Sequence, residues 1–292
     1  MFIIKFIHQN CLENCLSYIS MKFNQSINLY FLNGIDFGYC GKNKEIQNKF
    51  HYNKNFDSSY ETCLSFINKI SDISYEVFAN QFNFTECNGI TLCFTDAYDC
   101  YWNKAFQKEH INHYFILEPS LNHCIIIDPF CDIDNLIIEN KMLPKIQSYV
   151  KIYLNKTEID KISFKDIIYD LSTRKHIYNG IESFAEDIKN IASIDELVND
   201  NMKNIETSLM IRRLDRIINY RYNSYLYMKQ LGDIESLLVL NSYNQWNKIR
   251  SLFIRLFISK KASLLEHLAQ NIKEIAITEK KLIEHFSILT GR

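Results

Sequence analysis

Apolar positions follow different patterns in the two parts of the chain. Up to about residue 140, short aromatic and β-branched runs are separated by turn residues, which is typical of strands. The predicted strands are Ile27–Phe31, Ile90–Phe94, His113–Glu118 and His123–Asp128. These strands, with one early helix, predict an α+β domain over residues 1–140.

After Pro144 the chain has no proline, and apolar residues recur at helical spacing. The break at Gly232-Asp233 predicts two antiparallel helices on either side of it, and Ser193–Glu196 has the pattern of a helix start. We therefore expect a mainly helical domain over residues 141–292. The predicted helices are Phe164–Leu171, Gly180–Ile191, Ile194–Leu231, Ile234–Phe257 and Ala262–Leu289.

The early helix carries a candidate nucleophile. Its apolar stripe consists of Leu12, Cys15, Leu16, Ile19 and Phe23. Cys11 lies in the first turn, where free backbone N–H groups and the helix dipole stabilise a thiolate and can bind an oxyanion. Cys15, one turn further on, is interpreted as core. The alternative for Cys11 is also packing, since free cysteine is among the most buried residue types.

A β-hairpin supplies a candidate base and its partner. With Pro119–Asn122 as the loop, Glu118 pairs with His123, and His113 falls opposite Asp128. Directly opposed residues share a face, with Cβ atoms roughly 4.5–5.5 Å apart, so the carboxylate can fix the imidazole tautomer. Taken singly, a histidine at a strand start and an aspartate before proline are ordinary surface and turn residues. Only their joint arrangement with Cys11 indicates a Cys-His-Asp site.

Other polar residues are candidates for substrate binding. Gln9 or Asn10 would add a side-chain donor to the oxyanion site. Trp102 is a further candidate for contact with the substrate. Asp96 and Asp99 precede it and would bind a substrate amine, although they suit equally well the capping of the turn before the histidine strand. The competing candidates for the base are His8, His110 and His123.

Composition limits the remaining classes of protein. Hydrophobic residues make up 47% of the chain, and three prolines and seven glycines favour regular structure. A net charge of −1 gives no bulk attraction to nucleic acid. No apolar run is long enough for a membrane span, and Met1–Ile7 is too short for a secretory signal. Nine irregularly spaced cysteines without a C-x-x-C pair predict a reduced, cytoplasmic chain with no metal site.

The long predicted helix has a basic stretch with two interpretations. Arg212, Arg213, Arg216 and Arg221 lie outside its apolar face. They form either an ordinary solvated face, balanced by neighbouring acids, or a docking surface for an acidic carrier protein or its phosphate. Arginine suits the second interpretation because it binds phosphate through paired hydrogen bonds.

Short segments of the first half of the chain resemble the N-terminal domain of the butirosin-biosynthesis BtrH-type family. The resemblance implies a fold similar to papain-like cysteine peptidases, with a helix carrying Cys and a sheet carrying His and Asp. By position it assigns Cys11 as nucleophile, His113 as base and Asp128 as orienting acid. The segments that carry it are Asn10–Leu16, Asn33–Tyr39, Asp96–Lys108, His110–Tyr114 and Ile127–Phe130.

The resemblance further implies an acyltransferase or amide synthase of natural-product biosynthesis, the class that includes the cysteine-protease-like amide synthase of closthioamide biosynthesis. Such an enzyme moves an acyl group from a carrier-protein thioester, through a cysteine acyl-enzyme, to a small amine. It has no intrinsic cofactor, and the phosphopantetheine arm of an acyl or peptidyl carrier protein presents the donor. Two alternatives remain open: a cysteine peptidase or amidase, and a non-catalytic helical interaction protein.

Overall fold

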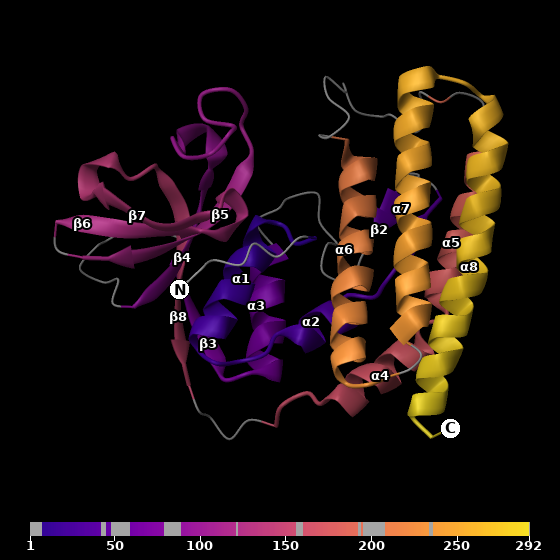
Figure 1. Cartoon of the computed structure of the whole chain (residues 1–292), viewed down its shortest axis with the longest axis horizontal. Coiled ribbons are helices and arrows are strands. Elements are labelled where there is room, and N and C mark those ends of the chain that lie inside the picture. Colours follow the sequence, from indigo (N-terminus) through magenta and orange to yellow (C-terminus); the bar gives the residue numbers. More distant parts are fainter. Residues whose placement is uncertain are drawn as a thin grey trace. The chain divides into compact units, whose positions relative to one another are not determined.

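The computed structural model describes residues 8–41, 45–47, 59–78, 89–120, 122–155, 160–191, 194, 208–233 and 236–291. Contacts divide the chain into two compact units (Figure 1). The sheet unit comprises Met1–Ile27 and Asn55–Lys161, and the helical unit comprises Asn28–Lys54 and Ile162–Arg292. This division differs from the single boundary expected at residue 140. The early segment from Asn28 belongs with the helices, and the last strand, which ends at Leu154, belongs to the sheet.

The sheet unit is built on one antiparallel sheet of six strands, in the order β3-β8-β4-β5-β6-β7. The last strand in sequence, β8, lies between β3 and β4 and pairs with both (Figure 1). Helix α1 packs on β5, and α3 packs on β3. The elements of this unit are α1 (Cys11–Lys22), α3 (Ser59–Ile70), β3 (Ile73–Phe78), β4 (Ile90–Asp96), η2 (Ala97–Asp99), β5 (Asn112–Pro119), β6 (His123–Asp128), η3 (Pro129–Cys131), β7 (Ile133–Glu139), η4 (Asn140–Met142) and β8 (Ile146–Leu154).

The predicted hairpin forms, but with a shorter turn than expected. Ser120 N–H donates to the carbonyl oxygen of His123 at 2.9 Å, and Glu118 pairs with Ile125. The expected pairing of Glu118 with His123, and of His113 with Asp128, is therefore wrong by two residues (125 − 123 = 2). An even shift leaves every side chain on its original face. His113 and Asp128 thus share a face as diagonal neighbours, a separation that long side chains can bridge.

One face of the sheet buries an apolar cluster that fixes the strands in place. Cys93, Phe115, Ile126 and Tyr149 belong to it, each almost fully excluded from solvent. Trp102, from the loop after β4, packs against the same cluster, with its ring edge-to-face on Phe115. His113 and Phe115 are two residues apart on β5, so their side chains lie on the same face of the sheet. The apolar cluster on that face therefore supports the strand that carries the candidate site.

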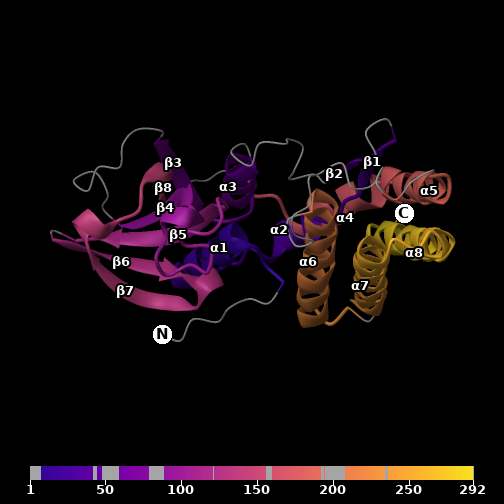
Figure 2. The ribbon, with the colours of Figure 1, turned by 90° about the horizontal axis from the view of Figure 1, so that it is seen from above.

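The helical unit contains helices close to those predicted at Phe164–Leu171, Gly180–Ile191, Ile234–Phe257 and Ala262–Leu289. The helix predicted at Ile194–Leu231 is shorter than expected, because α6 begins at Leu209 and Ser208 before it has a non-helical backbone. Helices α5 and α8, α6 and α7, and α7 and α8 pack side by side (Figures 1 and 2). Gly232, with φ of +75°, separates α6 from α7 as expected. The predicted start at Ser193–Glu196 lies outside the described residues except for Ile194. The elements are α2 (Asn28–Asn33), β1 (Gly38–Cys40), β2 (Glu45–Gln47), α4 (Phe164–Thr173), α5 (His176–Lys189), α6 (Leu209–Gln230), α7 (Ser236–Ser259) and α8 (Ser263–Leu289).

The strand predicted at Ile27–Phe31 is wrong, because residues Asn28–Asn33 form helix α2. A short apolar run has no periodicity that separates a strand from a buried helical turn. Tyr30 packs edge-to-face on Tyr220 of α6, and their hydroxyl groups lie 3.0 Å apart. The helix is followed by Gly34, where a Cβ atom would lie 2.5 Å from the Tyr220 ring, so the close approach requires glycine.

The basic stretch of α6 is interrupted by a buried residue. Arg221 is fully excluded from solvent, and its Nε donates to Glu279 Oε1 at 3.0 Å. The same oxygen accepts from Ser242 Oγ and Trp246 Nε1. Arg221 therefore belongs to the core of the bundle, and the expectation that it lies on a basic surface is wrong.

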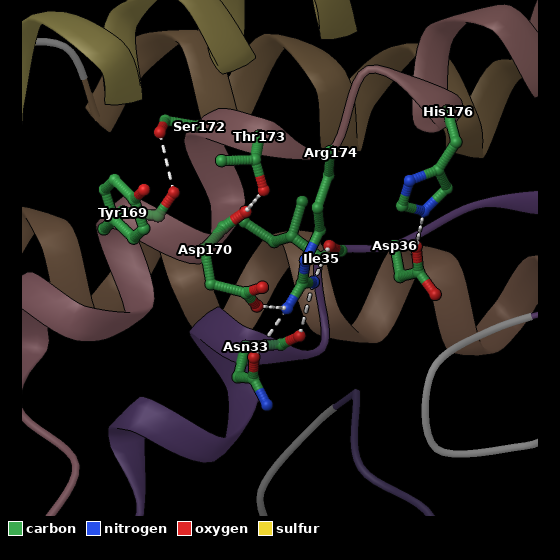
Figure 3. Close-up of polar contacts among 9 residues, drawn as sticks. All are labelled: Asn33, Ile35, Asp36, Tyr169, Asp170, Ser172, Thr173, Arg174 and His176. Atoms are coloured by element: carbon green, nitrogen blue, oxygen red, sulfur yellow. Dashed lines mark hydrogen bonds and ion pairs between the residues drawn. The ribbon is translucent and has the colours of Figure 1, made fainter.

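The segment that follows α2 is anchored by Arg174, which directly follows α4, and by His176, the first residue of α5 (Figure 3). Arg174 Nη1 donates to the carbonyl oxygens of Asn33 and Ile35, at 2.8 and 2.7 Å. His176 Nε2 bonds to Asp36 Oδ1 at 2.7 Å. Burial alone would raise the pKa of Asp36, but the His176 bond and the charges of Arg174 and Arg221 hold it below its ordinary value.

Among the described residues, no helix has both the length and the apolar character needed to cross a membrane.

Candidate active site

Cys11 is the first residue of α1, and the sequence before it fixes this start. The Asn10 side chain accepts a hydrogen bond from Glu13 N at 2.9 Å, and Glu13 Oε2 accepts one from Asn10 N at 3.0 Å. This reciprocal capping box ends the extended chain and begins the helix. It also gives Asn10 and Glu13 structural roles. The Asn10 side chain, which is a candidate oxyanion donor, is therefore also engaged in this cap through its Oδ1 atom.

The first turn of α1 presents backbone donors beside the Cys11 thiol. The helical ladder begins with Asn14 N donating to Asn10 O at 2.9 Å. In an α-helix, the N–H groups of the residues before the first such bond have no intrahelical partner. Among them, the Glu13 N–H is bound by the Asn10 cap. The N–H groups of Cys11 and Leu12 are therefore the donors that this turn offers to an incoming oxyanion.

The two cysteines of α1 occupy different environments. Cys15 is fully buried, its thiol donates to Tyr114 O at 3.6 Å, and burial raises its pKa well above the ordinary value. Its interpretation as core is confirmed. Cys11 is partly exposed. A thiol that reacts as a thiolate needs access and a nearby base, and of these two cysteines Cys11 has both.

His113 and Asp128 form a buried pair. His113 Nε2 lies 2.7 Å from Asp128 Oδ2, with 4% and 0% of the two side chains exposed. Because the carboxylate can only accept, Nε2 carries the proton in this bond, which leaves Nδ1 as the nitrogen that can take a proton from a thiol. The structure thus brings together the two residues that the sequence selects as base and orienting acid.

The charge of this pair follows from its bonds. Burial by itself lowers the pKa of His113, but hydrogen bonds with Asp128, Cys11 and Cys131 outweigh it and hold that pKa well above the ordinary value. Burial also favours the neutral form of Asp128. The bond and charge of His113 reverse this effect, so the pKa of Asp128 is lowered. The pair is consequently a carboxylate facing a strongly basic imidazole.

Asp128 is held by further donors. Trp102 Nε1 donates to the same oxygen, Oδ2, at 3.0 Å, and Cys131 N donates to Oδ1 at 3.2 Å. Trp102 is one of the candidate substrate residues of the sequence, and the structure gives its indole a second role, since it fixes the carboxylate that orients His113. The bond to Cys131 arises because Asp128 caps the short helix η3, which has Pro129 at its start.

The other candidate substrate residues have hydrogen bonds or positions outside the His113–Asp128 pair. Gln9 is buried, and its Oε1 accepts from Ser17 Oγ at 2.8 Å. Asp96 caps the turn after β4 through Tyr98 N and also binds Ile111 N, which confirms the capping alternative for this residue. Asp99 is exposed in that turn.

The competing histidines are placed elsewhere in the sheet unit. His110 is exposed, pairs with Asp96 at 2.7 Å and stacks on Tyr98. His123 lies at the start of β6, opposite Glu139 of β7. His8 precedes α1 in a left-handed backbone conformation, with φ of 69°. The imidazole held by Asp128 is that of His113, as the sequence analysis expects.

Cys131 also lies at this site, although the sequence patterns of the helix and the hairpin did not indicate it. Its thiol is hydrogen-bonded to His113 and accepts from Asn103 Nδ2 at 3.4 Å. Ligand atoms of His113, Asp128 and Cys131 lie within 4.8 Å of one another, a group that has the donors to hold a metal ion. The signal was present in the sequence: in Asp-Pro-Phe-Cys, an aspartate cap with proline next places the third following residue against its carboxylate.

A comparison with models of protein families finds no match to this chain. A comparison with curated proteins likewise finds no match.

Proposed function

We propose that the chain is a cysteine-dependent acyltransferase that joins an acyl group to an amine. The observation that carries this proposal is the Cys11 thiol at a helix N-terminus, hydrogen-bonded to an imidazole that the buried Asp128 orients. A helix carrying Cys, next to antiparallel strands carrying His and Asp, is the papain-like arrangement that the BtrH-type resemblance implies. That resemblance supports transfer to an amine rather than to water.

In the first half-reaction, His113 takes the thiol proton at Nδ1, and Cys11 Sγ attacks the carbonyl carbon of an acyl thioester. The backbone N–H groups of Cys11 and Leu12 stabilise the oxyanion of the tetrahedral intermediate. The carbon–sulfur bond of the donor then breaks, and the departing thiolate takes the proton back from His113. The product is a thioester on Cys11.

In the second half-reaction, the incoming amine attacks that thioester and passes its proton to His113. The intermediate collapses, an amide forms, and Cys11 leaves as thiolate. Asp128 stays ionised throughout and stabilises the imidazolium that appears in each half. A thioester is already activated, so this reaction needs no resident cofactor. We propose the phosphopantetheine arm of an acyl or peptidyl carrier protein as the donor and a small amine as the acceptor.

The test is intact-protein mass spectrometry after incubation with a panel of acyl thioesters, both small and carrier-bound. Wild-type protein should gain the mass of the acyl group, and an added amine should remove it and yield the amide. Cys11→Ala should show no gain. Cys15→Ala is the matched control from the same helix, because its thiol is buried and should leave the adduct unchanged.

Three outcomes would contradict the proposal. A folded wild-type protein that forms no adduct with any thioester would favour the interaction protein. Cleavage of peptide amides without transfer to an amine would favour the peptidase or amidase. An adduct that survives in Cys11→Ala would move the nucleophile to another thiol.

A further inference from the structure

Cys131 is a thiol beside the candidate site that the proposed reaction does not use. Its sulfur, a ring nitrogen of His113 and a carboxylate oxygen of Asp128 lie within 4.8 Å of one another. Cys131 is partly exposed, whereas the other two side chains are buried. The three ligand atoms are therefore already close together, two of them in the interior, and an ion would reach them from the partly exposed Cys131.

The three donor atoms are those that zinc prefers. Zn²⁺ binds thiolate sulfur at about 2.3 Å, imidazole nitrogen at about 2.0–2.1 Å and carboxylate oxygen at about 2.0–2.2 Å. His113 Nε2 and Asp128 Oδ2 are already 2.7 Å apart. Placing an ion between these two atoms and the Cys131 sulfur requires adjustments of only about 1 Å, and η3 is a short turn at the end of a strand.

The groups that would orient these ligands are also in place. Trp102 Nε1 and Cys131 N donate to the two oxygens of Asp128, at 3.0 and 3.2 Å. Asn103 Nδ2 donates to the Cys131 sulfur at 3.4 Å. Metal ligands in proteins are generally held in this way, by donors that do not touch the ion.

We propose that His113, Asp128 and Cys131 form a zinc site with an open fourth position. On binding, Zn²⁺ takes the lone pair of His113 Nε2, the proton that Nε2 held moves to Nδ1, and the proton of the Cys131 thiol is released to solvent. The neutral imidazole then carries its single proton on Nδ1. An imidazole in this state cannot accept the Cys11 proton, so zinc switches off the base. The zinc site rests on the geometry alone, and its effect on catalysis rests on the proposed function.

The first experiment is a Zn²⁺ titration of the full chain against a chromophoric chelator, without any acyl donor. We expect one Zn²⁺ per chain. Cys131→Ser should weaken binding by at least about tenfold, the scale on which even supporting residues of metal sites act. Cys40→Ser is the matched control: Cys40 is another partly exposed thiol, it lies in the helical unit, and its loss should leave the affinity unchanged.

A second experiment identifies the ligand without relying on the folding of one variant. Co²⁺ in place of zinc should give a thiolate-to-metal charge-transfer band that Cys11→Ser retains and Cys131→Ser loses. Absence of a one-to-one complex, or a band lost in Cys11→Ser and kept in Cys131→Ser, would overturn the proposal. Neither readout involves an acyl group, so failure of the zinc site and failure of the acyltransferase are separate results.

Discussion

Asp128 is the residue on which the hydrogen bonds of the candidate site converge. Its side chain is fully buried, and it accepts from His113, Trp102 and the Cys131 backbone. A buried carboxylate without such donors would take up a proton, since desolvation disfavours the charged form. The donors keep it ionised, and the ionised form keeps His113 basic. One side chain thus sets both the orientation and the protonation of the base.

Asp128→Asn tests this coupling. The amide keeps the shape but removes the negative charge, so the pKa of His113 should fall, because its main favourable partner is lost. The rate of the proposed acyl transfer should fall by about 10²–10⁴-fold, the usual contribution of a positioned base. The titration of His113 followed by NMR measures the first effect. An unchanged His113 pKa in a folded variant would mean that Asp128 does not control this imidazole.

At the scale of elements, the sequence predicted most of the described helices, but of the strands in the six-stranded sheet it predicted only β4, β5 and β6; helix α3 and strands β3, β7 and β8 were not expected. The strands carrying His113 and Asp128 were expected, and so was the helix that Cys11 begins. The hairpin register was wrong because the same loop sequence also fits a turn that is two residues shorter. The shared face survived because the error was even. Cys131 and the role of Trp102 depend on loops whose paths follow from tertiary packing, which no local pattern specifies.

The segment after α2 makes a prediction about acid stability. The pKa of Asp36 is lowered in the folded chain, so its ionised form stabilises the fold above the unfolded value of about 3.9, and that contribution is lost as the pH falls through the folded value. The free energy of unfolding should therefore decline on acidification less steeply in Asp36→Asn than in wild type. Denaturant unfolding across acid pH measures this. Asp99→Asn, an exposed site, is the control, and a slope like that of Asp36→Asn there would contradict the assignment.

For the molecule as a whole, the chain does not keep its two units in sequence order. The sheet unit uses residues on both sides of the segment from Asn28 to Lys54, and its sheet is completed only by β8. The sequence suggested a boundary at residue 140 because strand patterns thin out there. Sequence patterns describe neighbours along the chain, whereas β8 is placed by pairing with strands more than fifty residues earlier.

A fragment of residues 1–140 should therefore fail to form the sheet. The fragment lacks β8. Without β8, β3 loses the strand with which it pairs, and one edge of β4 is unpaired. Near-ultraviolet circular dichroism should show no fixed aromatic packing in this fragment. Joining residues 1–27 to 55–161 through a flexible linker should restore it. A well-packed 1–140 fragment would show that β8 is dispensable.

The late position of β8 also has a consequence for synthesis on the ribosome. Cys11 and its helix emerge early, but the strand that closes the sheet leaves the ribosome only after residue 154 has been added. At about 5–20 residues per second, the interval is on the order of ten seconds. Until then the edges of β3 and β4 that pair with β8 stay open, so the nascent chain is a client for chaperones until its last strand arrives.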